Sequence, residues 1–527
     1  MGVKAFEQGK ILAPFMGSPL MFIPGLDPLG VLNVGDLTSN KLLPGLTTIT
    51  ERIRYYSFYC WFFDMYSREI RILSKKEQFK YLRRAEYLLA LMAAKNQLQG
   101  IPGIPKAIKA YAESTGTIRL VEGTGELADS LAGSYWFNPR GVFGQNYVSS
   151  MVQMGMIKER QEGEGIYIRT DFTIDDRISG RQFAEAFQDN VGPDACKAFV
   201  TILQKGSLTM ADLEFLTEPF SMHQVANRSQ EQLLLWQFLI GPDHPIDPLD
   251  EFHRRRSIQM LLKRIIEKGN SVSALEFYLM AYHQQGIFDN QFDESFTLWY
   301  YFQLDQFWHM ASTGSLKAFL HFLNLETGGG AWTGEDSMIE KLASAAASFL
   351  VQEGFAKDQA SFNDLLISQE SEEDLVKEMN QTDPVKQVGY AMVLLRKLLK
   401  INQPNVDNLR KLTFRFQLSS PSNFINSVPD LVKHGDESLQ TFIAYFLKRY
   451  VVLRHQWVAL RKMNDTQTTE KFVREDGLIR FISTIDYGYS APRVETILGF
   501  LEDMRILNQG RESLTELGLE LYNQIPS

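Results

Sequence analysis

One short stretch of the chain carries several side chains of the types that bind divalent metals. It combines aspartate carboxylates with histidine imidazoles, and its members are Asp243, His244, Asp247, Asp250 and His253. Such side chains hold a metal only when the chain fixes their geometry. Prolines interrupt the stretch, so we interpret it as the capped entry of a helix. We therefore predict no metal site and no cofactor here.

A second candidate for chemistry is Arg449-Tyr-Val-Val-Leu-Arg-His455. Its spacing resembles that of a family of helical ribonucleases. The resemblance implies that Arg449 stabilises phosphate charge, that His455 transfers protons, and that two chains face each other to complete the site. Tyr450 departs from the family, in which a polar residue usually follows the arginine. The alternative is a buried connecting helix whose basic residues form pairs or extend to solvent.

Motifs of several enzyme classes are absent from the sequence. Gly9-Lys10 is the only Gly-Lys pair, and it lacks the rest of a phosphate-binding loop. The chain contains no Gly-x-Ser-x-Gly, His-Glu-x-x-His or Cys-x-x-Cys. It also lacks Asp-x-Lys and Glu-x-Lys, which restriction-type nucleases use to hold a metal and position a water. We therefore favour a non-enzymatic protein.

The densest aromatic run of the chain lies in residues 42–66. Pro44-Gly45 interrupts the chain, and Thr48-x-x-Glu51 has the spacing of a capping box, which predicts a helix from near Ile49. Apolar and aromatic residues fall at every angle of this helix, so we expect it to be buried on most sides.

Arg52 and Arg54 lie within this aromatic run. An unpaired buried charge is costly, so each guanidinium must pair with a carboxylate, stack on aromatic rings or line a hydrated cavity. Two interpretations stay open. Both arginines stack on core tyrosines, or they form a pocket for an anion or a nucleotide.

Residues 27–66 also carry a resemblance. The matching residues are Leu29, Gly30, Asp36, the run Leu42-Leu-Pro-Gly-Leu46, Thr50, Arg52, Arg54, Tyr55, Tyr56, Phe58 and Trp61. This pattern resembles the opening of an uncharacterised bacterial family whose members tend to be encoded near restriction and anti-phage genes. The resemblance implies a bacterial, antiviral-defence context and assigns no site.

Two segments have the order helix, short ribbon, helix that is typical of winged-helix domains. In residues 146–187, a helix over 147–156 precedes two short strands around a Glu-Gly-Glu-Gly tip. In residues 466–527, a helix that begins near Pro492 precedes a short wing and a closing helix. Thr515-x-x-Gly518 resembles the ending common in bacterial winged-helix regulators, and residues 173–187 contain a looser counterpart. We predict two winged-helix-like units.

Winged helices bind nucleic acid or dock proteins, and both alternatives stay open. The candidate reading helix of the C-terminal unit would present Arg493, Thr496 and Arg505 beside Glu495, Glu502 and Asp503. Three acids against two arginines are a poor match for a phosphate backbone. A separate basic run, Arg254, Arg255 and Arg256, lies on a predicted helix over 250–268. This run is either a solvated surface or a nucleic-acid-binding track.

Composition and length restrict the class of protein. With 527 residues the chain is too long for one core, and it is 44% hydrophobic and 22% charged, as soluble globular proteins are. A net charge of −9 disfavours wholesale wrapping of nucleic acid. Cys60 and Cys196 are the only cysteines, which fits a reducing cytoplasm and excludes a cysteine-rich zinc module. The sequence offers no secretory leader and no membrane-spanning segment, so we expect a cytoplasmic, non-membrane protein.

Hydrophobic periodicity predicts a mainly α, multi-domain helical protein with two winged-helix-like units. After an irregular arm over the first forty residues, helices are predicted near 75–99, 230–240, 250–268, 272–285, 294–324, 336–353, 384–401 and 436–463. We predict three domains. They are an N-terminal helical domain over 1–190 that ends in the first unit, a central helical domain over 191–420, and a long helix with the second unit over 421–527.

The predicted function is that of a non-enzymatic recognition or scaffolding subunit of a bacterial, anti-phage assembly. Other protein subunits are the expected partners, and nucleic acid is a further candidate partner. The alternatives are a metal-independent helical ribonuclease that uses Arg449 and His455, and a purely structural adaptor.

Overall fold

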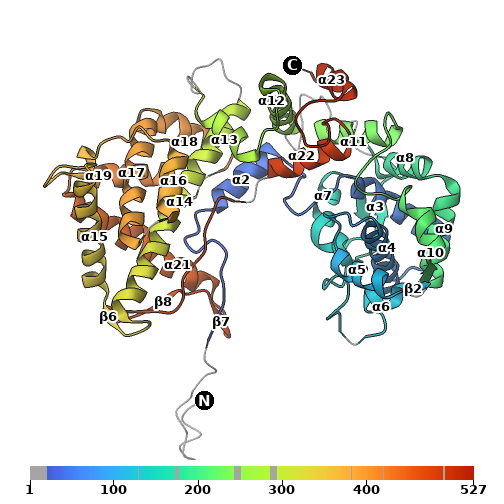
Figure 1. Ribbon diagram of the computed structural model, residues 1–527, viewed down its shortest axis with the longest axis horizontal. Helices are drawn as coiled ribbons and strands as arrows, with labels where there is room; N and C mark the ends of the chain where they lie inside the picture. The colour runs from blue at the N-terminus through green and yellow to red at the C-terminus, as the bar shows by residue number, and fades with distance from the viewer. Residues whose placement is uncertain are drawn as a thin grey trace, which may run out of the picture. The chain divides into compact units, whose positions relative to one another are not determined.

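The computed structural model describes residues 20–114, 116–128, 130–172, 177–241, 251–284, 294–381, 383–418, 420–490 and 493–526. The chain is mainly helical, with 62% helix and 6% strand, which confirms the predicted mainly α class; the two winged-helix-like units stay a prediction. Figure 1 labels these elements along the chain. Within the described ranges, every helix is too short or too polar to span a bilayer.

These residues form two compact units, and each unit combines separated parts of the sequence. Unit 1 consists of Met1–Leu37 and Tyr301–Ser490, whereas unit 2 consists of Thr38–Tyr300 and Ala491–Ser527. The main segment of unit 1 therefore interrupts unit 2 in the chain. The three consecutive domains stay a prediction, because a compact unit can contain more than one domain.

Helix α3 (Arg54–Met65) forms the centre of unit 2 and packs along α8 (Gly180–Val191). Aromatic side chains project from every side of α3 and meet apolar partners on each. Tyr56, Phe58 and Trp61 are each at most 1% exposed, which confirms their predicted burial. A helix covered on all sides needs no amphipathic stripe, in agreement with its sequence.

The start of α3 differs from the prediction. We expected a capping box to begin the helix near Ile49, but the helix begins at Arg54 and the preceding residue, Ile53, makes no side-chain cap. The preceding segment forms turns instead, in which the Thr50 hydroxyl donates to the carbonyl of Thr47 at 3.1 Å. The predicted helix start was therefore wrong, because the threonines bond within the turn.

The other helices and strands of unit 2 surround α3. Those before α11 are η1 (Tyr66–Ile70), α4 (Lys75–Lys95), α5 (Ile104–Glu113), β2 (Thr117–Arg119), α6 (Leu120–Thr124), η2 (Phe143–Tyr147), α7 (Val148–Gln153), β3 (Ile157–Glu159), β4 (Tyr167–Arg169), α9 (Pro193–Lys205), β5 (Ser207–Thr209) and α10 (Met210–Thr217). The later ones are α11 (Gln230–Ile240), α12 (Glu251–Lys268), α13 (Ala274–Tyr282), α22 (Arg493–Asp503) and α23 (Glu516–Asn523). Strands β2 and β5 pair antiparallel. The predicted caps Ser74 and Ser229 begin α4 and α11, and each hydroxyl accepts a backbone N–H of the first turn.

Unit 1 is a second helical body. Its first long helix, α14 (Glu294–Thr327), starts in unit 2 and continues into unit 1. The other helices are α15 (Glu335–Gln352), η3 (Phe362–Asp364), α16 (Glu372–Gln381), α17 (Pro384–Asn402), η4 (Gln403–Asn405), α18 (Val406–Arg415), α19 (Phe424–His434), α20 (Leu439–Phe446), η5 (Leu447–Val452) and α21 (Leu453–Lys462). The hairpin β8 (Phe472–Glu475) and β9 (Leu478–Phe481) adds β6 (Thr333–Gly334) at its edge. The helices predicted near 294–324, 336–353, 384–401 and 436–463 are confirmed.

The N-terminal arm is less irregular than predicted. Strand β1 (Met21–Phe22) pairs in parallel with β7 (Gln467–Thr468), and α2 (Asn33–Leu42) is helical where we expected no element. The Asp27 carboxylate accepts the N–H groups of Val31 and Leu32 at 2.9 and 3.1 Å. This bonding turns the chain into α2, a local effect that the dense prolines and glycines had concealed.

Phe58→Ala should lower the free energy of unfolding by about 3–5 kcal/mol, because the ring is fully buried and its loss leaves a cavity. Differential scanning calorimetry of the full chain measures the effect as a lower thermal midpoint. Phe172→Ala is the matched control, since that ring is 85% exposed. An unchanged midpoint for Phe58→Ala would show that α3 is not a core helix.

Candidate functional site

Unit 2 contains a helix–ribbon–helix arrangement in the region predicted to be winged-helix-like. Helix α7 ends at a turn through Gly155, whose φ of 72° suits glycine. The chain then forms the antiparallel pair β3–β4, with Ile157 opposite Arg169. The predicted ribbon is therefore present, and α8 follows it.

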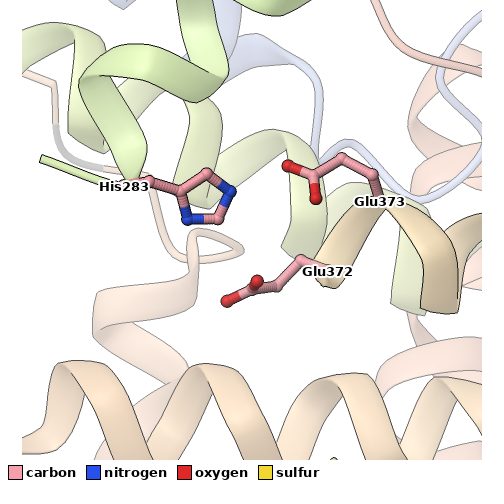
Figure 2. A group of neighbouring side chains, drawn as sticks. All are labelled: His283, Glu372 and Glu373. Carbon is pink, nitrogen blue, oxygen red and sulfur yellow. The ribbon is translucent and has the colours of Figure 1, made fainter. Parts of the chain in front are cut away.

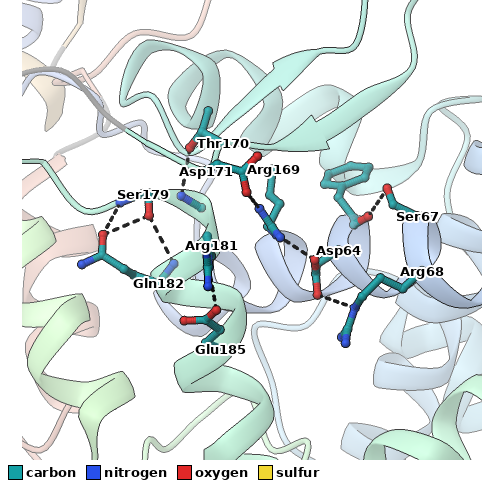
Figure 3. Close-up of polar contacts among 12 residues, drawn as sticks. Asp64, Ser67, Arg68, Arg169, Thr170, Asp171, Ser179, Arg181, Gln182 and Glu185 are labelled. Atoms are coloured by element: carbon teal, nitrogen blue, oxygen red, sulfur yellow. Dashed lines mark hydrogen bonds and ion pairs between the residues drawn. The ribbon is translucent and has the colours of Figure 1, made fainter.

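A single threonine ties this ribbon to both helices. Thr170 donates its hydroxyl to the Gly155 carbonyl at 2.7 Å. The same hydroxyl accepts the Gly180 N–H at 2.9 Å (Figure 3). Gly180 is the first residue of α8, and a Cβ there would collide with the carbonyl oxygen of Met156. We call this set of contacts the threonine latch. The threonine latch requires glycine at position 180, because the start of α8 lies directly against the turn that follows α7.

A second latch occurs at the C-terminus, also in unit 2. Helix α22 ends at Asp503, and the turn that follows passes through Arg505, which has a φ of 55°. Leu507 then bridges antiparallel to Leu514. Thr515 donates to the Arg505 carbonyl at 2.7 Å and accepts the Gly518 N–H at 3.0 Å. A Cβ on Gly518 would likewise collide with a carbonyl oxygen, in this case that of Ile506. The two arrangements are repeats of one local structure.

The repeat was only partly visible in the sequence. We expected the first counterpart of Thr515 at Thr173, which lies outside the described residues, but Thr170 makes the equivalent bonds. In the first copy, residues 171–179 separate the threonine from its glycine, whereas Thr515 and Gly518 are three apart. The ends of the preceding helices, Met-Gly-Met-Ile and Met-Arg-Ile-Leu, are the signal that could have aligned the copies.

The candidate reading helix α22 is charge-balanced. Arg511 pairs with Glu495 at 2.6 Å and with Glu502 at 2.8 Å. The exposed Arg505 donates to the Gln224 side chain at 2.8 Å. Thr496 and Arg493 are half-buried, and the latter also has a partner. The predicted nucleic-acid-binding residues of this unit therefore form no continuous basic track.

Arg54 is a core residue and not part of a ligand pocket. Its guanidinium is 3% exposed and pairs with Glu231 at 3.1 Å. It also donates to the carbonyls of Pro219 and Ser221 at 3.0 and 2.6 Å, and it lies 5.0 Å above the Phe187 ring. The interpretation of Arg54 as a ligand-binding residue is corrected, because protein groups occupy each of its nitrogens.

Arg52 is also engaged within unit 2. It pairs with Asp503 at 2.8 Å and donates to the Gln99 carbonyl at 3.1 Å. Burial raises the pKa of the Asp503 carboxyl to about 7, although Arg52 opposes the shift. Arg52 therefore joins the loop before α3 to the end of α22, and it does not face an open pocket with Arg54.

The basic run at 254–256 is largely internal. Arg254 is 0% exposed and donates to the carbonyls of Leu239, Phe238 and Pro44 at 2.8, 2.9 and 2.6 Å. Arg255 is buried, and Arg256 donates to the Gln259 side chain. The surface predicted at Arg254 is corrected, because its donors bind carbonyls in the last turn of α11 and in the loop at Pro44.

His455 is a structural residue of unit 1. It is 1% exposed, donates from Nδ1 to the Pro28 carbonyl at 3.0 Å and accepts the Lys471 N–H at Nε2 at 3.0 Å. Burial lowers the pKa of the imidazole to about 4. Both ring nitrogens are occupied by main-chain groups, so His455 has none left for proton transfer to a substrate. Arg449, by contrast, is exposed on η5.

Side chains of the types that bind metals occur in both units. Glu372 and Glu373 begin α16 in unit 1 (Figure 2). Glu372 pairs with Lys397 at 3.4 Å. His283, the third side chain drawn, caps α13 in unit 2. These three residues belong to different units and carry no argument for a metal site.

Most of the predicted Asp/His cluster, residues 243–250, lies outside the described residues. Its last member, His253, is buried, and its Nδ1 lies 2.9 Å from the Ser295 hydroxyl.

Comparison with protein-family models, with curated proteins and with solved structures found no match. The function therefore has to be argued from the geometry of the chain itself.

Gly518→Ala should destabilise unit 2 by about 2 kcal/mol or more, because the new Cβ forces α23 away from the Ile506 carbonyl. Gly180→Ala should have a similar effect, since it breaks the equivalent latch. Thermal midpoints of the full chain measure both changes. Gly488→Ala is the control, because a Cβ there meets nothing within 4 Å and its φ is ordinary. Equal midpoints for all three variants would contradict the latch.

His455→Gln should reduce the acid sensitivity of folding. The pKa of His455 is about 4 in the folded chain and 6.5 ordinarily, so the unfolded chain binds more protons between these values. Stability is therefore full above pH 6.5 and decreases as the pH falls towards 4, by up to about 3 kcal/mol. Calorimetry at pH 7 and pH 5 should show a smaller loss in the variant than in the wild type. Identical losses would show that His455 titrates normally.

Proposed function

We propose that this protein is a non-enzymatic recognition and scaffolding subunit, and that its two latched arrangements are winged-helix-like modules that dock a partner protein. The observation that carries the proposal is the double pairing of Arg511 with Glu495 and Glu502. Phosphate-backbone binding requires arginines and lysines that are available to replace counterions. A reading helix whose charges are neutralised in place is better suited to a protein surface.

The first module supports the same conclusion. On its ribbon, Arg160 pairs with Glu164 at 2.6 Å. Beside the ribbon, Arg169 pairs with Asp64 at 2.7 Å and also with Asp171 (Figure 3). Arg160 and Arg169 of the first module therefore pair with acidic side chains, as Arg511 does in the second module. Phe172, which follows this network, is 85% exposed, and aromatic side chains are enriched at protein interfaces.

The proposed setting is a bacterial, anti-phage assembly in the cytoplasm. The resemblance of residues 27–66 to a family encoded near defence genes supports the context. Cys60 and Cys196 are buried free thiols, which agrees with a reducing compartment. The engaged ring of His455 disfavours the ribonuclease alternative, since that reaction requires a proton-transfer group.

Co-expression with the products of the neighbouring genes tests the proposal. We expect size-exclusion chromatography with light scattering to show a stable complex of defined stoichiometry. Phe172→Glu should prevent the complex from forming without changing the thermal midpoint of the chain itself. Phe414→Glu in unit 1 is the control, because that ring is equally exposed, at 86%.

The same purified protein should show no RNA cleavage and no tight binding to duplex DNA or RNA at low salt. Arg181 is exposed in the first turn of α8, where it pairs with Glu185 at 2.7 Å. Salt-sensitive binding to either nucleic acid that Arg181→Glu abolishes would reassign the modules to nucleic-acid recognition. Failure of every neighbouring product to form a complex that depends on Phe172 would overturn the docking proposal.

A further inference from the structure

Unit 1 contains a cavity of about 540 Å³ beside η5. The residues that line it come from α14, the loop before α19 and its first two turns, η5, the first two turns of α21, and the N-terminal arm. Each of these lining residues belongs to unit 1. This volume lies in the range of small-molecule sites. A π-helical turn such as η5 often marks a functional site, because its extra residue redirects side chains from the helix axis.

The cavity has an excess of positive charge. Arg449 lines it, is exposed, and makes no hydrogen bond or ion pair within the part of unit 1 that the structure describes. Arg454 also lines the cavity, and its Nε donates to the Leu29 carbonyl at 2.7 Å. Burial lowers the pKa of Arg454, and the nearby charges of Arg461 and Arg449 lower it further, although Asp27 opposes the shift. Like charges held together in this way favour an anion between them.

Aromatic rings stand next to these guanidinium groups. Trp457 lines the cavity and is 49% exposed, and Arg454 lies 4.6 Å from its ring. Tyr450 lines it as well and stacks on Phe446 behind it. Arg461 lies 4.7 Å from the same ring. An exposed tryptophan beside arginines is suited to a planar, electron-rich ring that carries an anionic group.

The cavity also contains groups that can bond to hydroxyls. Asp430 accepts the hydroxyls of Tyr445 and Tyr450 at one oxygen, Oδ2, at 2.5 and 2.7 Å. The Nε2 of His434 lies 4.0 Å from the other oxygen, Oδ1, which is too far for a hydrogen bond. Ser312 lines the wall, is 1% exposed, and its hydroxyl is without a hydrogen-bond partner among the described residues. Buried hydroxyls are normally paired, so this one indicates a partner that comes from outside the chain.

We propose that this cavity binds a mononucleotide, with Arg449 and Arg454 on the phosphate, Trp457 against the base and Asp430 on the ribose hydroxyls. The phosphate, the base and the ribose of the ligand each have their own binding group in the cavity. The inference does not depend on partner docking by the modules of unit 2, because the cavity is formed by unit 1 alone.

Isothermal titration calorimetry of the full chain tests the proposal. The probes are the four ribonucleoside monophosphates, the corresponding nucleosides and inorganic phosphate, each at about 1 mM, which reveals dissociation constants in the millimolar range or below. At least one monophosphate should bind, more tightly than its nucleoside and than phosphate. Arg449→Gln should weaken its binding about tenfold or more, the value of one charge-assisted hydrogen bond.

Two further variants separate this site from general effects. Lys448→Gln removes the same charge from the neighbouring position on η5, where Lys448 pairs with Asp336, and it should leave affinity unchanged. Trp457→Ala should weaken the nucleotide but not inorganic phosphate, which a merely structural role would not produce. Binding by none of the probes, or equal losses in Arg449→Gln and Lys448→Gln, would overturn the proposal.

Discussion

The ion pair between Arg54 and Glu231 is the interaction on which unit 2 depends. Glu231 is 0% exposed and also accepts the hydroxyl of Ser57 at 2.6 Å and the amide of Asn190. The pair thereby joins α3, α8 and α11 at the centre of the aromatic core. Removing one partner of such a pair leaves a buried charge uncompensated, at a cost of about 3–5 kcal/mol. The aromatic residues of α3 provide burial, and this pair fixes which helices they meet.

Several buried basic side chains of this protein donate to main-chain carbonyls. Arg83 donates to the carbonyls of Thr124, Trp136 and Asn138, and Arg254 makes the same kind of contacts in its own region. In unit 1, Lys462, His455 and Arg454 bind the consecutive carbonyls of residues 26–29. Loops that cross a core carry backbone groups that regular structure does not pair. Guanidinium groups supply several donors each, which explains why basic residues occur here without forming a binding surface.

The contrast between these engaged cations and Arg449 connects the architecture with the functional proposals. Charges in both latched modules are matched with partners, which favours docking of a protein. Arg449 has no such partner among the described residues and stands at a cavity with an exposed tryptophan. A recognition subunit requires both a surface for its partner and a means of responding to a ligand. Under these two proposals, partner docking falls to unit 2 and ligand binding to unit 1.

The sequence by itself determined the helical fold class, the burial of α3, the caps at Ser74 and Ser229 and the ribbons after α7 and α22, because periodicity and capping are local properties. It did not determine what the charged residues do. Glu231 lies 177 positions from Arg54, and Pro28 lies 427 from His455. Only the tertiary structure brings such groups together, so only it could assign Arg54 and His455 to the core, place α3 at Arg54 and identify Thr170 as the counterpart of Thr515. The partner of a buried charge depends on long-range packing, which no local pattern encodes.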